Sequence, residues 1–104
     1  MDYHFIADLA DPASIPADGI LSRTVYDDVQ VKAVLFGFSQ GEMLSEYTAS
    51  MPAILHIVRG DARLTLAGDT KDAPAGAWVH MPANMPHSIY ATTPLVMLLI
   101  LLKT

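Results

Sequence analysis

The sequence predicts a single all-β domain, a small sandwich or barrel. From residue 20 onward, short apolar segments are separated by turn residues roughly every eight to twelve positions, a spacing typical of antiparallel β-proteins. No long stretch shows the 3.6-residue period of an amphipathic helix. The length of 104 residues suits one hydrophobic core. Closure into a barrel would protect the edges of such a sheet, so we expect a barrel or jelly roll.

Residues 1–19 are expected to form an N-terminal arm that precedes the barrel domain at residues 20–104. Pro12, Pro16 and Gly19 interrupt any regular pattern there, which leaves room for at most a short strand near residues 4–6. An arm of this kind can lie along a neighbouring subunit or be disordered, and the sequence leaves both open.

The barrel domain is expected to contain about eight or nine strands. The clearest strand covers residues 62–66, because Ala62, Leu64 and Leu66 alternate with polar residues, as in a half-buried strand. Gly68 and Asp69 then predict a hairpin turn, since glycine tolerates the positive φ of tight turns. The other expected strands lie at residues 22–26, 29–38, 42–47, 54–58, 71–73 and 95–103, and on both sides of residues 82–86.

Composition excludes several functions. The chain is 52% hydrophobic and 16% charged, which indicates a globular protein. Its net charge is −5 and its six basic residues are scattered, so we expect no nucleic-acid partner. Without cysteine there is no disulfide or thiolate metal site. The N-terminus lacks the pattern of a secretory signal, and the apolar segment 95–102 is too short to span a membrane as a helix. We therefore expect a cytoplasmic protein without a membrane partner.

The segment 76–91, GAWVHMPANMPHSIYA, is the strongest candidate for a functional site. Pro82 and Pro86 fix the backbone on both sides of a short turn and donate no hydrogen bonds to a sheet. His87 follows at the start of a new strand. The turn should therefore hold His87 rigidly, in a position that suits a ligand-binding or catalytic group.

This segment resembles the second of the two motifs of the cupin superfamily, whose fold is a double-stranded β-helix or jelly-roll barrel. Gly76, Pro82 and His87 match that motif. Asn84 stands where the motif has a second glycine, and Ala91 stands where it has an asparagine. Asparagine also tolerates the left-handed conformation that such a turn needs. The resemblance implies that His87 occupies a metal-ligand position.

Residues 41–60 resemble the first cupin motif in their spacing and in both of its glycines. The three ligand positions of that motif carry Tyr47, Ala49 and Ala53 instead of two histidines and a glutamate. Transition-metal sites need three or more converging donors. The resemblance therefore implies a cupin that binds a small molecule in its barrel without a tightly bound metal, as a sensor, carrier or accessory protein. His87 and Tyr47 would supply the polar contacts.

Further residues extend this site and leave alternatives open. His80 would join His87 and Tyr47 as a third donor if its side chain points inward, and the protein would then be a metal-dependent dioxygenase or isomerase with zinc, nickel, iron or manganese. His56 is a further candidate ligand, although strand periodicity places it on the opposite face from Leu55. Trp78 and Met85 are expected to line the pocket or to belong to the core.

A third alternative for the function is a structural or interaction module whose barrel pocket is collapsed.

We also expect a homodimer, because the apolar final strand and the N-terminal arm are more than one small barrel can cover.

Overall fold

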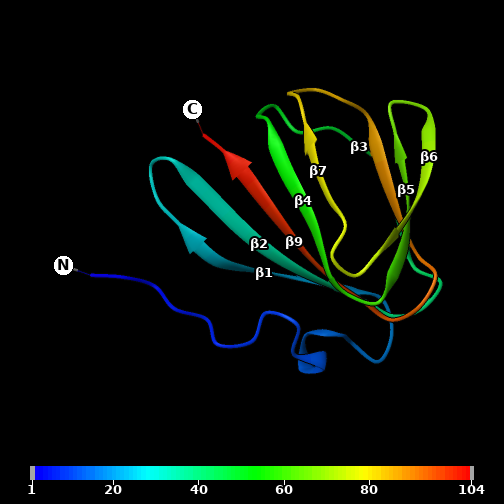
Figure 1. Ribbon diagram of the computed structural model, residues 1–104, viewed down its shortest axis with the longest axis horizontal. Helices are drawn as coiled ribbons and strands as arrows, with labels where there is room; N and C mark the ends of the chain where they lie inside the picture. The colour runs from blue at the N-terminus through cyan, green and yellow to red at the C-terminus, as the bar shows by residue number, and fades with distance from the viewer. Residues whose placement is uncertain (1, 104) are drawn as a thin grey trace.

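The computed structural model describes residues 2–103, except for the side chains of Glu46 and Tyr47 (Figure 1). Nearly all of its regular structure is strand, which confirms the all-β prediction. The described residues form one 3-10 helix, η1 (Pro12–Ser14), and nine strands: β1 (Ile20–Asp27), β2 (Val31–Phe38), β3 (Met43–Tyr47), β4 (Ala53–Arg59), β5 (Asp61–Leu66), β6 (Asp69–Pro74), β7 (Trp78–Met81), β8 (His87–Ala91) and β9 (Leu95–Leu102).

The strands form two antiparallel sheets that face each other. The five-stranded sheet has the order β1-β2-β9-β4-β7, and the four-stranded sheet has the order β3-β8-β5-β6. The sheets come together at the end where β4 turns into β5 and spread apart at the opposite end (Figure 1). Strand β9 lies in the middle of the five-stranded sheet, where it pairs with both β2 and β4.

The core lies between the two sheets and follows from the alternation of side chains along each strand. In β4, Ala53, Leu55 and Ile57 are buried, whereas the residues between them are only partly buried. Strands β5 and β8 alternate in the same way and face β4 with their apolar side chains. The predicted pattern at residues 62–66 is confirmed, since Ala62 and Leu64 are buried.

The β5–β6 hairpin has a two-residue turn, because Leu66 pairs with Asp69. Ala67 and Gly68 form the turn with φ values of 50° and 90°. Positive φ at both positions is the signature of a type I′ turn, whose twist matches that of the flanking strands. The hairpin is confirmed, but its turn begins at Ala67, one residue before the predicted glycine.

The arm contains no strand within residues 2–19, so the short strand allowed near residues 4–6 does not form. It lies against the outer face of the five-stranded sheet and is held there by individual contacts. Arg59 Nη1 donates a hydrogen bond to the carbonyl oxygen of Ala10 at 3.3 Å. The rings of His4 and Tyr26 have centroids 5.5 Å apart.

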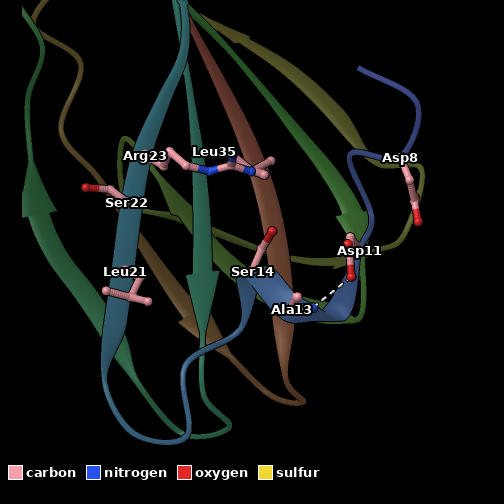
Figure 2. Close-up of a pocket in the computed structure, with 8 residues that line it drawn as sticks. All are labelled: Asp8, Asp11, Ala13, Ser14, Leu21, Ser22, Arg23 and Leu35. Carbon is pink, nitrogen blue, oxygen red and sulfur yellow. Dashed lines mark hydrogen bonds between the residues drawn. The ribbon is translucent and has the colours of Figure 1, made fainter. Parts of the chain in front are cut away.

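A hollow of about 580 Å³ separates part of the arm from β1 and β2 (Figure 2). Asp8 and Asp11 line it from the arm, and Arg23 lines it from β1. Asp11 already accepts a hydrogen bond from the backbone N–H of Ala13 at 2.9 Å, which caps η1. This hollow is therefore a surface feature of arm packing and lies outside the barrel.

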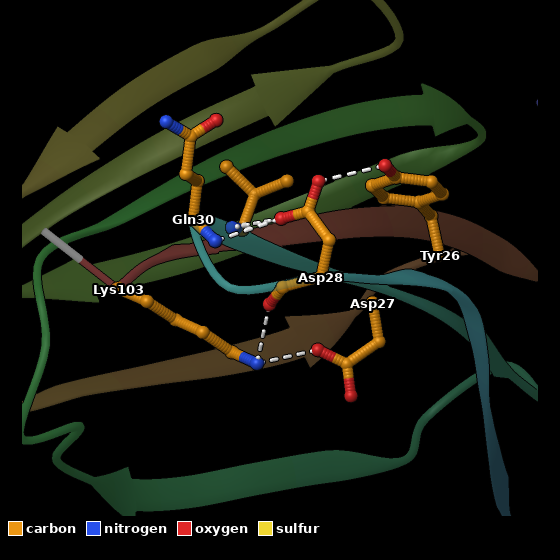
Figure 3. A network of polar contacts seen from close by, with 6 residues as sticks. Tyr26, Asp27, Asp28, Gln30 and Lys103 are labelled. Atoms are coloured by element: carbon orange, nitrogen blue, oxygen red, sulfur yellow. Dashed lines mark hydrogen bonds and ion pairs between the residues drawn. The ribbon is translucent and has the colours of Figure 1, made fainter. Parts of the chain in front are cut away.

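A polar network joins the β1–β2 hairpin to the chain after β9 (Figure 3). The Asp28 carboxylate accepts a hydrogen bond from the Tyr26 hydroxyl at 2.7 Å and from two backbone N–H groups at 2.8 and 2.9 Å. The Tyr26 bond, then the backbone bonds, lower the pKa of Asp28, while Asp28 raises the pKa of Tyr26. Lys103 Nζ lies 2.5 Å from a carboxylate oxygen of Asp27.

Candidate ligand-binding site

His87 begins β8 and points into the barrel, where it is 5% exposed. Its backbone pairs with Leu66 on one side and Tyr47 on the other. Its Nδ1 lies 3.1 Å from the carbonyl oxygen of Met85. A carbonyl oxygen can only accept, so Nδ1 carries a proton and donates this bond. Met85 thus orients His87 through its backbone.

The turn before His87 is fixed to both neighbouring loops. Asn84 has a φ of 66°, the left-handed conformation expected at this position. Its N–H donates to the carbonyl oxygen of Ala49 at 2.7 Å, and the N–H of Ala67 donates to that of Pro86 at 3.0 Å. These bonds to the β3–β4 and β5–β6 connections are consistent with a turn that presents His87 rigidly.

His80 and Trp78 lie on the outer face of β7, away from His87. Met81 is buried, whereas Trp78 and His80 are exposed, because side chains alternate along the strand. The inward orientation considered for His80 is therefore wrong, and His80 does not join His87 as a donor. Trp78 also reaches the rim of a partly open cavity.

His56 lies on the outer face of β4, as strand periodicity predicted. Its backbone pairs with Trp78, and its side chain is partly buried. Its Nδ1 is buried without a hydrogen-bond partner among residues 2–103. His56 therefore lies on the outer face of the five-stranded sheet, whereas His87 lies on the inner face of the four-stranded sheet. The two side chains cannot share a ligand.

The donors that the structure describes do not fit a transition-metal site. The side chains described within residues 2–103 contain no cluster of three histidine, aspartate or glutamate residues. Ala53 and Met81 are paired across β4 and β7, where they supply buried apolar groups to the interior. The side chain of Tyr47 lies outside the described residues, so its predicted contact with a ligand stays a prediction. One imidazole alone does not provide the three donors that a metal needs.

A partly open cavity of about 280 Å³ lies between the sheets, on the side where β6 and β7 form their outer strands and where the exposed Lys71, Asp72 and Trp78 border it. Leu66 lines it and is the residue paired with His87. Sequence reasoning found part of this cavity, since Trp78 was expected to line the pocket and strand alternation placed Leu55, Ile57, Leu64 and Leu66 inside. Its lining residues are Leu55, Ile57, Leu64, Leu66, Lys71, Asp72, Ala73, Ala77, Trp78 and Val79.

A separate hollow of about 390 Å³ lies beside the His87 turn. It is lined by Met43, Ser45, Thr65, Gly68, Pro86, Ser88 and His87 itself. Thr65 and Ser88 pair with each other on the face of the sheet opposite to His87 and Leu66. His87 therefore borders this hollow, which shares no lining residue with the cavity of about 280 Å³.

Solved structures of other proteins share the fold of this chain. No protein-family model matches the sequence, and no curated protein matches it. Among solved structures, a conserved protein of unknown function from Streptococcus pyogenes is 27% identical, with a TM-score of 0.85 over 100% of this chain and 91% of that one. A cupin superfamily protein from Desulfitobacterium hafniense is 26% identical, with a TM-score of 0.80 over 90% and 88%.

A third structure, KdgF from a Halomonas species, is 21% identical, with a TM-score of 0.79 over 100% of this chain and 96% of that one.

Within the part of the chain that the structure describes, no helix is long and apolar enough to cross a membrane. The sheet topology and these matches show that the chain is a small single-domain protein with the cupin fold.

Proposed function

We propose that this cupin binds a small molecule between its two sheets, without a tightly bound metal, in the role of a sensor, carrier or accessory protein. The observation that carries the proposal is the cavity of about 280 Å³. Ligand pockets typically have volumes of about 300 to 1,000 Å³. A cavity just below this range suits a compact ligand.

The apolar walls would bind the body of a ligand, and His87 would make a polar contact with it. Both sheets contribute aliphatic side chains, such as Leu55 and Leu64, so the body of a ligand would gain affinity by burying apolar surface. His87 is not among the residues that line the cavity, but it is buried beside Leu66, which does line it, so its imidazole could make a polar contact with a ligand that extends past Leu66. A His87–ligand hydrogen bond would then fix the orientation of the bound molecule.

The metal-dependent alternative has less support because two of its proposed ligands, His80 and His56, lie on the outer face. Elemental analysis of protein purified without added metal addresses it directly. We expect clearly substoichiometric zinc, nickel, iron and manganese. A content near one ion per chain would contradict the proposal.

Ligand binding is tested by a thermal-shift screen with small organic molecules, followed by a variant that fills the cavity. Ala73 is buried on the inner face of β6 and lines the cavity, whereas Ala75 is exposed in the next turn. Ala73→Leu should abolish the shifts that hits produce, and Ala75→Leu should retain them. Shifts that persist unchanged in a folded Ala73→Leu variant would show that binding occurs elsewhere and would contradict the proposal.

A further inference from the structure

We infer that the cavity between the sheets selects ligands with an apolar body and an anionic end, and that Lys71 recognises the anion. The inference rests on the proposed function and adds the chemical class of the ligand. A short aliphatic or aromatic monocarboxylate has this chemistry. The observations that lead to it are the composition of the cavity wall and the placement of two opposite charges on β6.

The cavity wall is apolar apart from two adjacent residues of β6. Strands β4, β5 and β7 contribute aliphatic side chains together with Trp78, and β6 contributes Lys71, Asp72 and Ala73. A liquid water molecule occupies about 30 Å³, so the volume corresponds to about nine water molecules. A ligand of roughly that many non-hydrogen atoms would fill the space and would be mostly hydrocarbon.

Lys71 lies on the cavity side of β6. Its backbone pairs with that of Leu64, whose buried side chain faces the interior, and directly paired residues share one face of a sheet. Ala73, two residues further along, is buried on the same face. Lys71 itself is exposed, so its ammonium group can stand at the rim while its methylene groups lie along the apolar wall.

The charge of Lys71 is unmatched, whereas that of its neighbour is matched. Asp72 points to the opposite face of β6, where its carboxylate lies 3.4 Å from Nε of Arg63. No salt bridge joins Lys71 to any of the described residues. The rim of the cavity therefore carries a positive charge that no ion pair among the described side chains matches.

This local charge can outweigh the negative charge of the whole chain. The net charge is −5, but charges beyond about 8 Å are screened at physiological ionic strength. A carboxylate at the rim would therefore interact mainly with the charges close to it, which are Lys71 and the Asp72–Arg63 ion pair. Exposed ion pairs are weak, which predicts a preference for the anion of up to about fivefold.

The test titrates octanoate and the neutral 1-octanol into the full protein, with amide NMR shifts as the readout. Octanoate should bind about three- to fivefold more tightly than 1-octanol, and its largest shifts should fall on residues that line the cavity. The preference should decrease as sodium chloride is raised, because salt screens an exposed pair. Octylamine, which has the opposite charge, should bind more weakly than 1-octanol.

Two variants in the β5–β6 hairpin test whether Lys71 causes the preference for octanoate over 1-octanol. Lys71→Gln should bind octanoate and 1-octanol equally, whereas Arg63→Gln, which removes one positive charge from the opposite face, should keep the preference. Equal affinities in the unmodified protein, or an unchanged preference in Lys71→Gln, would overturn the inference and leave the proposed function standing. Absence of binding by both probes would also overturn it, while the proposed function stands or falls on the screen with Ala73→Leu.

Discussion

Gly37 of β2 and Ser14 of the arm approach each other so closely that a Cβ atom on Gly37 would overlap the carbonyl oxygen of Ser14. Gly37 is buried, and its backbone is not in the left-handed region. Glycine is therefore needed here for space. This contact lets the arm lie flat against the outer face of the five-stranded sheet.

Gly37→Ala should displace the arm or strain the sheet beneath it. Overpacking of this kind typically costs about 1 to 3 kcal/mol, and in a domain of this size each 1 kcal/mol lowers the melting temperature by about 4 to 8 °C. Calorimetry measures the loss, and chymotrypsin cleavage near Leu9 reports release of the arm. Gly76→Ala is the control, because Gly76 has a φ of 97° but open space around it. It should lower stability without exposing the arm, and equal arm cleavage in both variants would contradict this account.

Ala67→Asn should stabilise the β5–β6 hairpin by about 0.5 to 1 kcal/mol. Ala67 has a φ of 50°, which is unfavourable for alanine and tolerated by asparagine, and Asn-Gly is a preferred type I′ pair. Urea unfolding measures the change. Ala75→Asn, at an exposed turn position without positive φ, should have little effect. A loss of stability in Ala67→Asn would contradict the turn assignment.

His87→Leu should destabilise the protein by about 1 to 3 kcal/mol, because it leaves the carbonyl oxygen of Met85 without its donor. His87→Asn should recover part of that loss, since the asparagine amide can donate from nearly the same position as Nδ1. Chemical unfolding of the three proteins gives the comparison. If His87→Asn is less stable than His87→Leu, the bond to Met85 does not orient the ring.

Stability should decrease in acid partly through Asp28. The hydrogen bond from Tyr26 lowers the pKa of Asp28 in the folded protein, so the unfolded chain takes up the proton first as the pH falls below about 4. The contribution is complete above the unfolded pKa and is lost as the pH falls through the folded one. The gap in melting temperature between the unmodified protein and Asp28→Asn should therefore narrow below pH 4. A gap that is constant from pH 7 to pH 3 would contradict this.

We expect a homodimer with twice the mass of 11.2 kDa. The expectation rests on apolar side chains that remain on the outer surface, among them Leu21 at 57% and Trp78 at 60% exposure, and on the half-buried Ile100 of β9. Sedimentation at micromolar concentration measures the mass. A value near 11 kDa would show that these side chains stay in water.

The strands could be predicted from sequence because alternation and turn residues are local signals. Residues 62–66 show this, since each apolar position there faces the core. The orientation of His80 could not be predicted. Its neighbours on both sides are apolar, so the pattern of β7 fits either face, and only the pairing of Ile54 with His80 fixes the orientation.

The cavity as a whole was also beyond sequence reasoning, because it depends on how two sheets meet. Lys71 and Val79 belong to two different strands, and no local sequence pattern links one residue to the other. They line the same cavity only because β6 and β7 are the outer strands on the same side of the sandwich. The turn that presents His87 was predictable because its two prolines act on their own backbone.

The central position of β9 also constrains how the protein emerges from the ribosome. Strands β2 and β4 pair with β9 on its two sides and not with each other, so each has only one of its two partners, β1 or β7, until residues 95–102 have been synthesised. Until then the nascent chain exposes apolar strands with unpaired backbone groups, which favours chaperone binding or aggregation. The five-stranded sheet is thus complete only once β9 has joined β2 to β4.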